Sequence, residues 1–266
     1  MPAGDRPPED QPKPLDKRSG RGITLVRNIL LGATAVGLLV LIGVLIFSSE
    51  DEPPSTTVDT TLAPSQGIVF QDDFASRTNG WTDAGSTRAG AHYTNKAYRI
   101  FVEPTGSNSY KGGVPRSAGS VYPSAPSNLR IEVDAKAFTV PEGTAYGVAC
   151  RVSQDESSGY LFMVANDYVS VSKYGIDGNY TQLSDARGLP LPSGFKENGT
   201  NRLEADCNGG EGDEVRLVFR VNGQVAAEAT DSKDPLVAGT VALVGEAYEE
   251  AEKAVEVEFD NFVVQA

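Results

Sequence analysis

The stretch that decides the fold is VRLVFRV over residues 215–221, followed by Asn222-Gly223 and by QVAAEAT over residues 224–230. In its first arm, apolar residues recur at every second position, which is the period of a β-strand with one buried face. Asn-Gly favours the two-residue type I′ turn, because both central residues of that turn need a positive φ. The stretch therefore predicts a β-hairpin.

The same period of two extends over much of residues 67–266. Residues 129–136 alternate apolar and charged side chains, and residues 160–166 and 168–174 read as a second hairpin. Further strands are expected at residues 68–70, 98–102, 146–154, 180–184, 201–207, 240–245 and 255–264, with a short helical turn at residues 248–253. Many short strands separated by Gly-rich turns indicate an all-β fold, a two-sheet antiparallel sandwich.

Both cysteines fall on the apolar face of an expected strand, with Cys150 beside Val148 and Val152 and Cys207 in a similar setting. Outside the cytoplasm such a pair is expected to form a disulfide. The bond would close a loop of 57 residues and stabilise the fold by about 4 kcal/mol in the chain-entropy model. Two separate buried thiols are the alternative. A catalytic cysteine is not expected, because nothing brings His92, a predicted surface residue, close to either thiol.

Residues 29–47 form an uncharged run of 19 residues that is rich in Leu, Val, Ile and Gly. As a helix this run would be about 28 Å long, close to a hydrocarbon core of about 30 Å, and it lacks the polar face of a soluble helix. Basic residues precede it and acidic residues follow it, so the N-terminus is expected in the cytoplasm. A cleaved signal peptide fits less well, because the run is long and is followed by a poor cleavage site.

Four segments follow from this pattern. Residues 1–28 are Pro-rich and charged, as in a disordered cytoplasmic tail, and residues 29–47 form the transmembrane helix. Residues 48–66 are acidic and rich in Pro, Thr and Ser, which indicates an extended linker. Residues 67–266 are then the extracytoplasmic β-sandwich domain of a single-pass cell-membrane protein.

The charge excludes several classes of partner. The chain holds 23 Lys and Arg against 36 Asp and Glu, a net charge of −13, so nucleic acid is not expected as a ligand. Residues 67–266 hold 17 basic and 28 acidic side chains, a formal charge of −11, which disfavours anionic polymers and lipid surfaces. One His and two Cys cannot supply a four-ligand zinc site. Uncharged glycans or proteins fit better as ligands, and no cofactor is expected.

Several separated motifs fit one known family. They are FQDDFASRTNGW (70–81), YGVACRVSQDESSGYLFMV (146–164), NRLEADCNGG (201–210), LVFRVNGQVAAEATD (217–231) and EFDNFVV (258–264). Together they resemble the concanavalin A-like lectin and glucanase jelly rolls, laminin-G-like modules included, of bacterial envelope and secreted proteins. That family includes binding modules and glycosidases, so the resemblance implies a jelly-roll fold and says little about function.

The resemblance also implies that the first and last strands are neighbours and that Trp81 lies in the core beside the first strand. Asp72 and Asp73 would then approach Asp260 and Asn261, and their oxygen atoms could hold a structural Ca²⁺. The alternative is that these residues cap turns at strand ends.

Glycoside hydrolysis needs two carboxyl groups at a fixed separation. Glu132 and Asp134 share one strand face and resemble the start of the acidic strand of laminarinase-type enzymes, but the third acid of that strand is missing. Glu256 and Glu258 share one face of the last expected strand. These four residues are the candidate catalytic acids, and the alternative is that they form a solvated outer face.

Sugar recognition by a sandwich uses flat aromatic rings and a few fixed polar groups. Tyr168 and Tyr174 occupy one strand face, and Tyr160 and Tyr180 belong to neighbouring expected strands. Arg151 would serve as the polar anchor of this candidate ligand-binding surface. The alternative is that tyrosines simply favour half-buried strand positions.

The anchor, the linker and the incomplete catalytic set favour a non-catalytic binding module for a glycan or a cell-envelope protein. Two other functions stay open. One is a carbohydrate-active hydrolase of the laminarinase or keto-glucoside hydrolase type, which would use the acids named above. The other is a structural or sensory subunit of a membrane complex.

Overall fold

The structure is a computed structural model, and it describes residues 67–107, 109–113, 116–117, 120–121, 125–175, 179–185, 188–210 and 213–266. The tail, the transmembrane helix and the linker expected within residues 1–66 lie outside this part. Among the described residues, no helix combines the length and the apolar character needed to cross a membrane.

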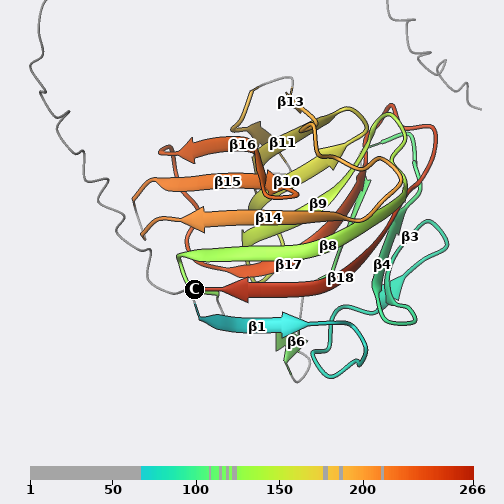
Figure 1. Ribbon diagram of the computed structural model, residues 1–266, viewed down its shortest axis with the longest axis horizontal. Helices are drawn as coiled ribbons and strands as arrows, with labels where there is room; N and C mark the ends of the chain where they lie inside the picture. Colours follow the sequence, from blue (N-terminus) through green and yellow to red (C-terminus); the bar gives the residue numbers. More distant parts are fainter. Residues whose placement is uncertain are drawn as a thin grey trace, which may run out of the picture. The chain divides into compact units, whose positions relative to one another are not determined.

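The described strands pair into two large antiparallel sheets, and in Figure 1 the larger sheet lies in front of the smaller one. The nine-stranded sheet has the order β16-β15-β14-β8-β18-β4-β3-β2, and β1 pairs with β18 beside this path. Its strands are β1 (Ile68–Asp72), β2 (Ala84–Gly85), β3 (Ala89–Tyr93), β4 (Tyr98–Val102), β8 (Leu129–Thr139), β14 (Asn201–Asn208), β15 (Val215–Val221), β16 (Gln224–Asp231) and β18 (Val255–Gln265).

The seven-stranded sheet has the order β12-β11-β10-β9-β17-β5, with β13 paired to β11. Its strands are β5 (Ser109–Gly113), β9 (Thr144–Val152), β10 (Gly159–Ala165), β11 (Tyr168–Tyr174), β12 (Tyr180–Gln182), β13 (Leu189–Pro190) and β17 (Thr240–Ala247). A separate ribbon pairs β6 (Arg116–Ser117) with β7 (Ser120–Val121). The predicted two-sheet antiparallel sandwich is therefore confirmed.

The main core lies between the two sheets. Aromatic pairs join them: the ring centroids of Tyr146 and Phe259 are 6.5 Å apart, and those of Phe162 and Phe219 are 5.8 Å apart. Trp81 is 2% exposed and belongs to the same core, which confirms its expected place.

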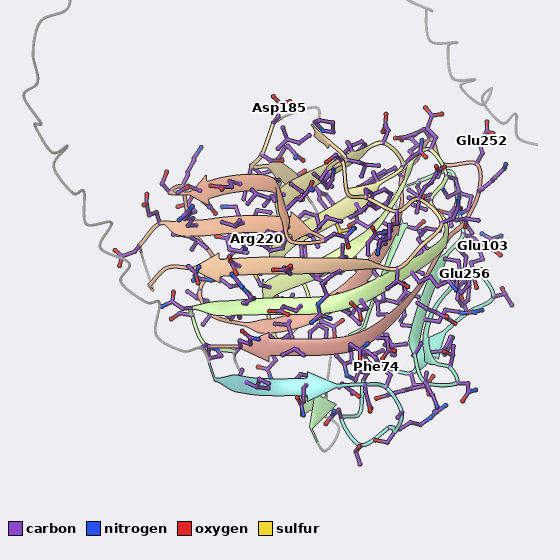
Figure 2. All side chains as sticks on the ribbon, viewed as in Figure 1. Phe74, Glu103, Asp185, Arg220, Glu252 and Glu256 are labelled. Atoms are coloured by element: carbon purple, nitrogen blue, oxygen red, sulfur yellow. A yellow bond between two sulfur atoms is a disulfide. The ribbon has the colours of Figure 1, made fainter. Side chains whose placement is uncertain are left out.

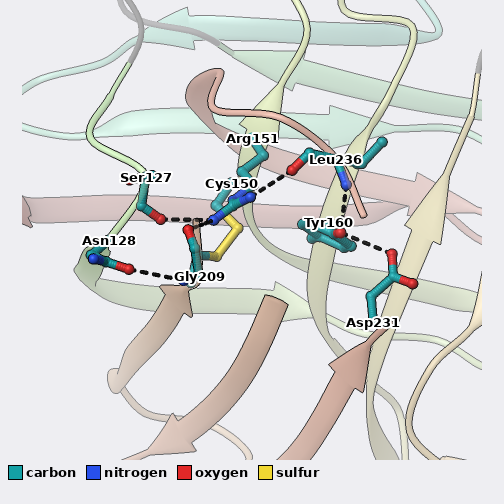
Figure 3. Close-up of a disulfide and its surroundings, with 9 residues drawn as sticks. Ser127, Asn128, Cys150, Arg151, Tyr160, Gly209, Asp231 and Leu236 are labelled. Carbon is teal, nitrogen blue, oxygen red and sulfur yellow. Dashed lines mark hydrogen bonds between the residues drawn. A yellow bond between two sulfur atoms is a disulfide. The ribbon is translucent and has the colours of Figure 1, made fainter. Parts of the chain in front are cut away.

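The predicted disulfide is also present and connects the two sheets. Cys150 on β9 and Cys207 on β14 are bonded, with their Cα atoms 6.7 Å apart, and both residues are fully buried. The bond therefore lies inside the sandwich rather than on its surface (Figure 3).

The two ends of the sandwich domain meet. The backbone N–H of each of Gly67 and Ala266 donates to the carbonyl of the other, at 3.0 and 3.1 Å. The start of β1 therefore lies beside the end of β18, as the family resemblance implied (Figure 1).

The hairpin at residues 215–230 forms as predicted, because Asn222 and Gly223 both have positive φ, at 53° and 76°. The expected helical turn at residues 248–253 is wrong. In its place the Ala251 N–H donates to the Tyr248 carbonyl at 3.0 Å and forms a turn.

The expected placement of Val152 on the same face as Cys150 is also wrong, because Val152 packs in a second apolar cluster. The reason is Arg151, whose φ is +50°. Next to it, the pairing of β17 with β9 shifts in register between Thr240 and Ala242. Such a bulge interrupts the alternation of side chains along a strand.

Candidate functional site

The acids expected on β8 are held by an arginine on the nine-stranded sheet. Arg202 contacts Glu132 Oε2 through Nη2 at 2.9 Å and Asp134 Oδ1 through Nη1 at 3.3 Å. The side-chain amide of Asn261 donates to the other oxygen of Asp134 at 2.9 Å. These contacts do not present the free pair of acids that glycoside hydrolysis needs.

The acids expected on β18 are held in the same manner. Arg99 contacts Glu256 through Nη1 at 2.8 Å and Glu258 through Nη2 at 2.9 Å, while its guanidinium also lies 5.1 Å from the centre of the Phe138 ring. Glu256, like Arg220 on β15, is labelled on the larger sheet in Figure 2. The geometry therefore supports a solvated, ion-paired outer face and gives no support to catalysis by these residues.

Arg151 is not part of an exposed binding surface, because it is 2% exposed and lies between the sheets (Figure 3). Its guanidinium donates to the backbone carbonyls of Ser127, Gly209 and Leu236 at 2.8, 2.7 and 2.5 Å. The positive φ of this residue carries the side chain inward, beside the disulfide. Its role is to join three loops rather than to anchor a ligand.

Tyr160 is likewise enclosed, with no exposed surface. Its hydroxyl donates to Asp231 Oδ2 at 2.8 Å and accepts the Leu236 N–H at 2.8 Å. Lys173 also contacts Asp231, at 2.7 Å. Tyr160 therefore completes an internal polar network, and the expectation of a ligand contact does not fit its position.

The other three expected tyrosines share the side of the seven-stranded sheet that faces away from the main core. Tyr168 and Tyr174 stand at the two ends of β11, and Tyr180 on β12 pairs with Tyr174. The rings of Tyr174 and Tyr180 have centroids 6.2 Å apart and planes inclined at 32°. Tyr180 is 47% exposed. We call the surface formed by these three residues, together with Tyr248, the tyrosine face.

A carboxyl group that the sequence analysis missed lies under the tyrosine face. Glu246 on β17 is 3% exposed and accepts the hydroxyl of Tyr180 at 3.1 Å. It is also hydrogen-bonded to Tyr248, which is in turn hydrogen-bonded to Tyr168. One polar chain therefore joins β11, β17 and β12 across the face.

Burial raises the pKa of the Glu246 carboxyl, and the hydrogen bonds from Tyr248 and Tyr180 offset part of that rise. Burial also raises the pKa of Tyr248 and of Tyr168, with further rises from nearby acidic groups. The phenols and the carboxyl are therefore all biased toward their neutral forms. Neutral O–H groups can both donate and accept, which suits the hydroxyl groups of a sugar.

The floor beneath these groups is apolar and is made mostly of small side chains. It is a second cluster of buried residues, separate from the main core: Ala145, Ala149, Val152, Leu161, Met163, Ala165, Ala242 and Val244. Tyr168, Tyr174 and Tyr248 pack against this cluster. An apolar floor with a few polar groups and aromatic rings has the composition of a ligand site.

A separate cleft of about 370 Å³ lies between the loop that follows β1 and the end of β18. It is lined by Gln71, Asp72, Asp73, Ser76, Thr78, Asn79, Asn261, Phe262 and Val263. Three of the expected calcium ligands, Asp72, Asp73 and Asn261, therefore border it, whereas Asp260 is not among these lining residues. Within the described ranges, no group of three or more His, Cys, Asp or Glu could hold a metal ion.

The two aspartates at this cleft cap backbone turns. Asp72 Oδ1 accepts the Phe74 N–H at 2.7 Å, and Asp73 Oδ1 accepts the Ala75 N–H at 3.0 Å. Asp72 Oδ2 accepts the indole N–H of Trp81 at 2.9 Å. These bonds correspond to the turn-capping alternative, and they engage both oxygens of Asp72.

No family model matches the sequence, and no curated protein matches it. Among solved structures, a protein of unknown function with a galectin-like fold from Bacillus subtilis is 9% identical, with a TM-score of 0.50 over 75% of this chain and 96% of that one. A structure described with endo-acting O-glycanases of the human gut microbiota, which initiate mucin breakdown, is 10% identical, with a TM-score of 0.50 over 75% and 99%. The carbohydrate-binding module CBM66 of Bacillus subtilis is 16% identical, with a TM-score of 0.49 over 71% and 97%.

At such low identity the likeness concerns the fold alone. The domain is a two-sheet jelly-roll β-sandwich, and this fold is what it shares with the galectin-like protein and with the structure described with O-glycanases.

Proposed function

We propose that this protein is a non-catalytic glycan-binding module, which residues 29–47 anchor in a cell membrane with the jelly-roll domain outside. The observation that carries the proposal is the tyrosine face, in which Tyr168, Tyr180 and Tyr248 lie near the buried carboxyl of Glu246. Aromatic rings offer flat apolar surfaces to the faces of sugar rings, and the hydroxyls beside them fix orientation.

The ligand is an uncharged glycan. The domain carries a formal charge of −11, and the groups that act on Glu246 are phenols rather than cations. An anionic sugar would therefore meet repulsion, and the described partners of Glu246 supply no positive charge to offset it. Uncharged hydroxyl groups match the neutral donors and acceptors of the face.

The outer location is supported by the uncharged run at residues 29–47 and by the charges on its two sides. The buried disulfide between Cys150 and Cys207 also suits an oxidising compartment. Extraction with alkaline carbonate tests the anchor, and protease added to intact cells tests the orientation. Release of the intact protein by carbonate would contradict the anchor.

Glycan binding is tested with the full-length protein in a detergent that has no sugar headgroup. The array carries uncharged glycans together with uronate-containing and sialylated ones. We expect binding to one or more uncharged glycans, with no release of reducing sugar. Empty arrays with capture of one envelope protein in cross-linking would favour the membrane-complex function, and release of sugar would favour the hydrolase.

A further inference from the structure

Glu246 differs from the buried acids Asp206 and Asp231, which are both paired with cations, in what surrounds it. The carboxylate of Asp206 is held by two arginines, with Arg130 Nε at 2.7 Å and Arg220 Nη1 at 2.5 Å. The described partners of Glu246 are two phenols, those of Tyr180 and Tyr248. A buried carboxyl without a cation is more stable when it is protonated.

The described side chains of the strands on either side of Glu246 add no cation to this environment. Its backbone partners are Ala145 on β9 and Tyr110 on β5. The cation next along β5 is Lys111, which pairs with Gly245. Successive residues of a strand point to opposite sides of the sheet, so Lys111 leaves on the side away from Glu246.

The charged groups near Tyr168 are acidic. Tyr168 interacts electrostatically with Glu250, Asp167 and Glu246, and it is hydrogen-bonded to Tyr248. Negative charge near this chain of contacts further disfavours a second charge on Glu246. The proton on the carboxyl is therefore supported by burial, by the apolar floor and by its acidic neighbours.

An ionised Glu246 would keep its two phenol donors, but it would place over an apolar floor a carboxylate that has no cation among its described partners. The side chain would be drawn toward water and would displace Tyr180, which bonds to it, and Tyr248, which lies next to it. Both rings belong to the tyrosine face. Loss of one proton would therefore disorganise the surface that contacts the glycan.

We infer that Glu246 is the positioning residue of the tyrosine face: as a neutral acid it holds Tyr180 and Tyr248 by hydrogen bonds, and glycan binding weakens when it ionises. This inference rests on the proposed function. It adds that the affinity of the module is set by pH through a residue that need not touch the sugar.

The test reads the array of uncharged glycans with the full-length protein between pH 5 and pH 9. We expect the wild-type affinity to fall at least tenfold as pH rises. The Glu246→Gln variant, an uncharged match for the neutral acid, should keep the acid-pH affinity within about threefold over the whole range. The control Glu228→Gln removes an exposed acid paired with Arg216 and should follow the wild type.

A second variant keeps the test decisive if Glu246→Gln does not fold. Tyr248→Phe removes a donor that favours the ionised carboxyl, so it should move the fall in affinity to higher pH. A pH profile that is flat in the wild type, or equally steep in Glu246→Gln, would overturn the inference, as would a shift to lower pH in Tyr248→Phe. Absence of binding at every pH would instead overturn the proposed function.

Discussion

The carboxylate of Asp72 accepts the indole N–H of Trp81 at 2.9 Å, and both side chains are buried. The same carboxylate caps the loop after β1 through the Phe74 N–H. Asp72 therefore fixes the position of the tryptophan against the main core. Both acids at residues 72–73 therefore stabilise the fold. Asp72 does so from a buried position, whereas Asp73 is exposed.

Replacing Asp72 with Ala should lower the free energy of unfolding by about 2–4 kcal/mol, because it leaves two buried N–H donors without an acceptor. The control Asp73→Ala loses one exposed cap and should cost about 1 kcal/mol or less. Urea unfolding followed by the fluorescence of Trp81, the single tryptophan, measures both. Equal losses in the two variants would contradict this role for Asp72.

Replacing Tyr180 with Ala should weaken glycan binding about tenfold, or about 1.4 kcal/mol, because an exposed ring of the tyrosine face is removed. Phe138 provides the matched control, since it is a 43% exposed aromatic residue on the other sheet. Phe138→Ala should leave the affinity unchanged. Titration calorimetry with the glycan found on the array compares them, and equal affinities in both variants would argue against this surface.

Reduction of the disulfide between Cys150 and Cys207 should lower the free energy of unfolding by about 4 kcal/mol, because the bond closes a loop of 57 residues. Both cysteines are fully buried, so a reductant should act slowly on the native protein and quickly once urea has opened it. Urea unfolding with and without reductant measures the difference. An unchanged midpoint after complete reduction would show that the bond does not constrain the unfolded chain.

The pH dependence of stability should show the ion pairs of Asp206. Burial raises the pKa of this carboxyl. The hydrogen bonds from Arg130 and Arg220 lower the pKa by more than burial raises it, so the pKa in the folded protein lies below the ordinary value. Its contribution is therefore present above the ordinary pKa and is lost as pH falls through the folded pKa.

The free energy of unfolding of Asp206→Asn should accordingly be about 3–5 kcal/mol lower than that of the wild type at pH 7, because two arginines lose their carboxylate partner. When pH is lowered from 5 to 2, the free energy of unfolding should fall by less in Asp206→Asn than in the wild type. Urea unfolding at several pH values measures the slope, with Glu228→Gln as the exposed control. Parallel pH curves for Asp206→Asn and the wild type would contradict the assignment.

The fold could be predicted to a large extent from the residues, because alternation and turn chemistry act locally. The hairpin over residues 215–230 and the strand at residues 98–102 form as expected. The short strand β3 could not be predicted, since its sequence AGAHY contains small residues without a clear alternation. Such a strand is defined by its pairing with β4 rather than by its own residues.

The site was predictable in part for the same reason. Tyr168 and Tyr174 could be selected because alternation places them on one face of one strand. Glu246 was missed because the expected strand ended at residue 245, although Ala242 and Val244 already indicated the face that it would join. Its bond to Tyr180 connects strands far apart in the sheet order, and residue spacing carries no signal for that contact.

The position of Arg151 could not be predicted from the sequence. A left-handed backbone at an arginine is rare, and the flanking residues carry no sign of it. The period of two therefore predicted that Arg151 would face outward. The bulge turns its side chain inward instead, where it donates hydrogen bonds to the loops at Ser127 and Gly209. Tertiary contacts determine this position, and they are invisible in a one-dimensional pattern.

The meeting of Gly67 with Ala266 has a consequence for protein engineering. Ends that lie side by side can be spliced with a short Gly-Ser bridge while the chain is reopened elsewhere, and the exposed loop at Thr105-Gly106 offers such an opening. A circular permutant of this kind would keep the order of strands in space while changing the point at which a tether or a fusion partner leaves the domain. The point at which the jelly roll is attached to another molecule can thus be changed without changing the side chains on its surface.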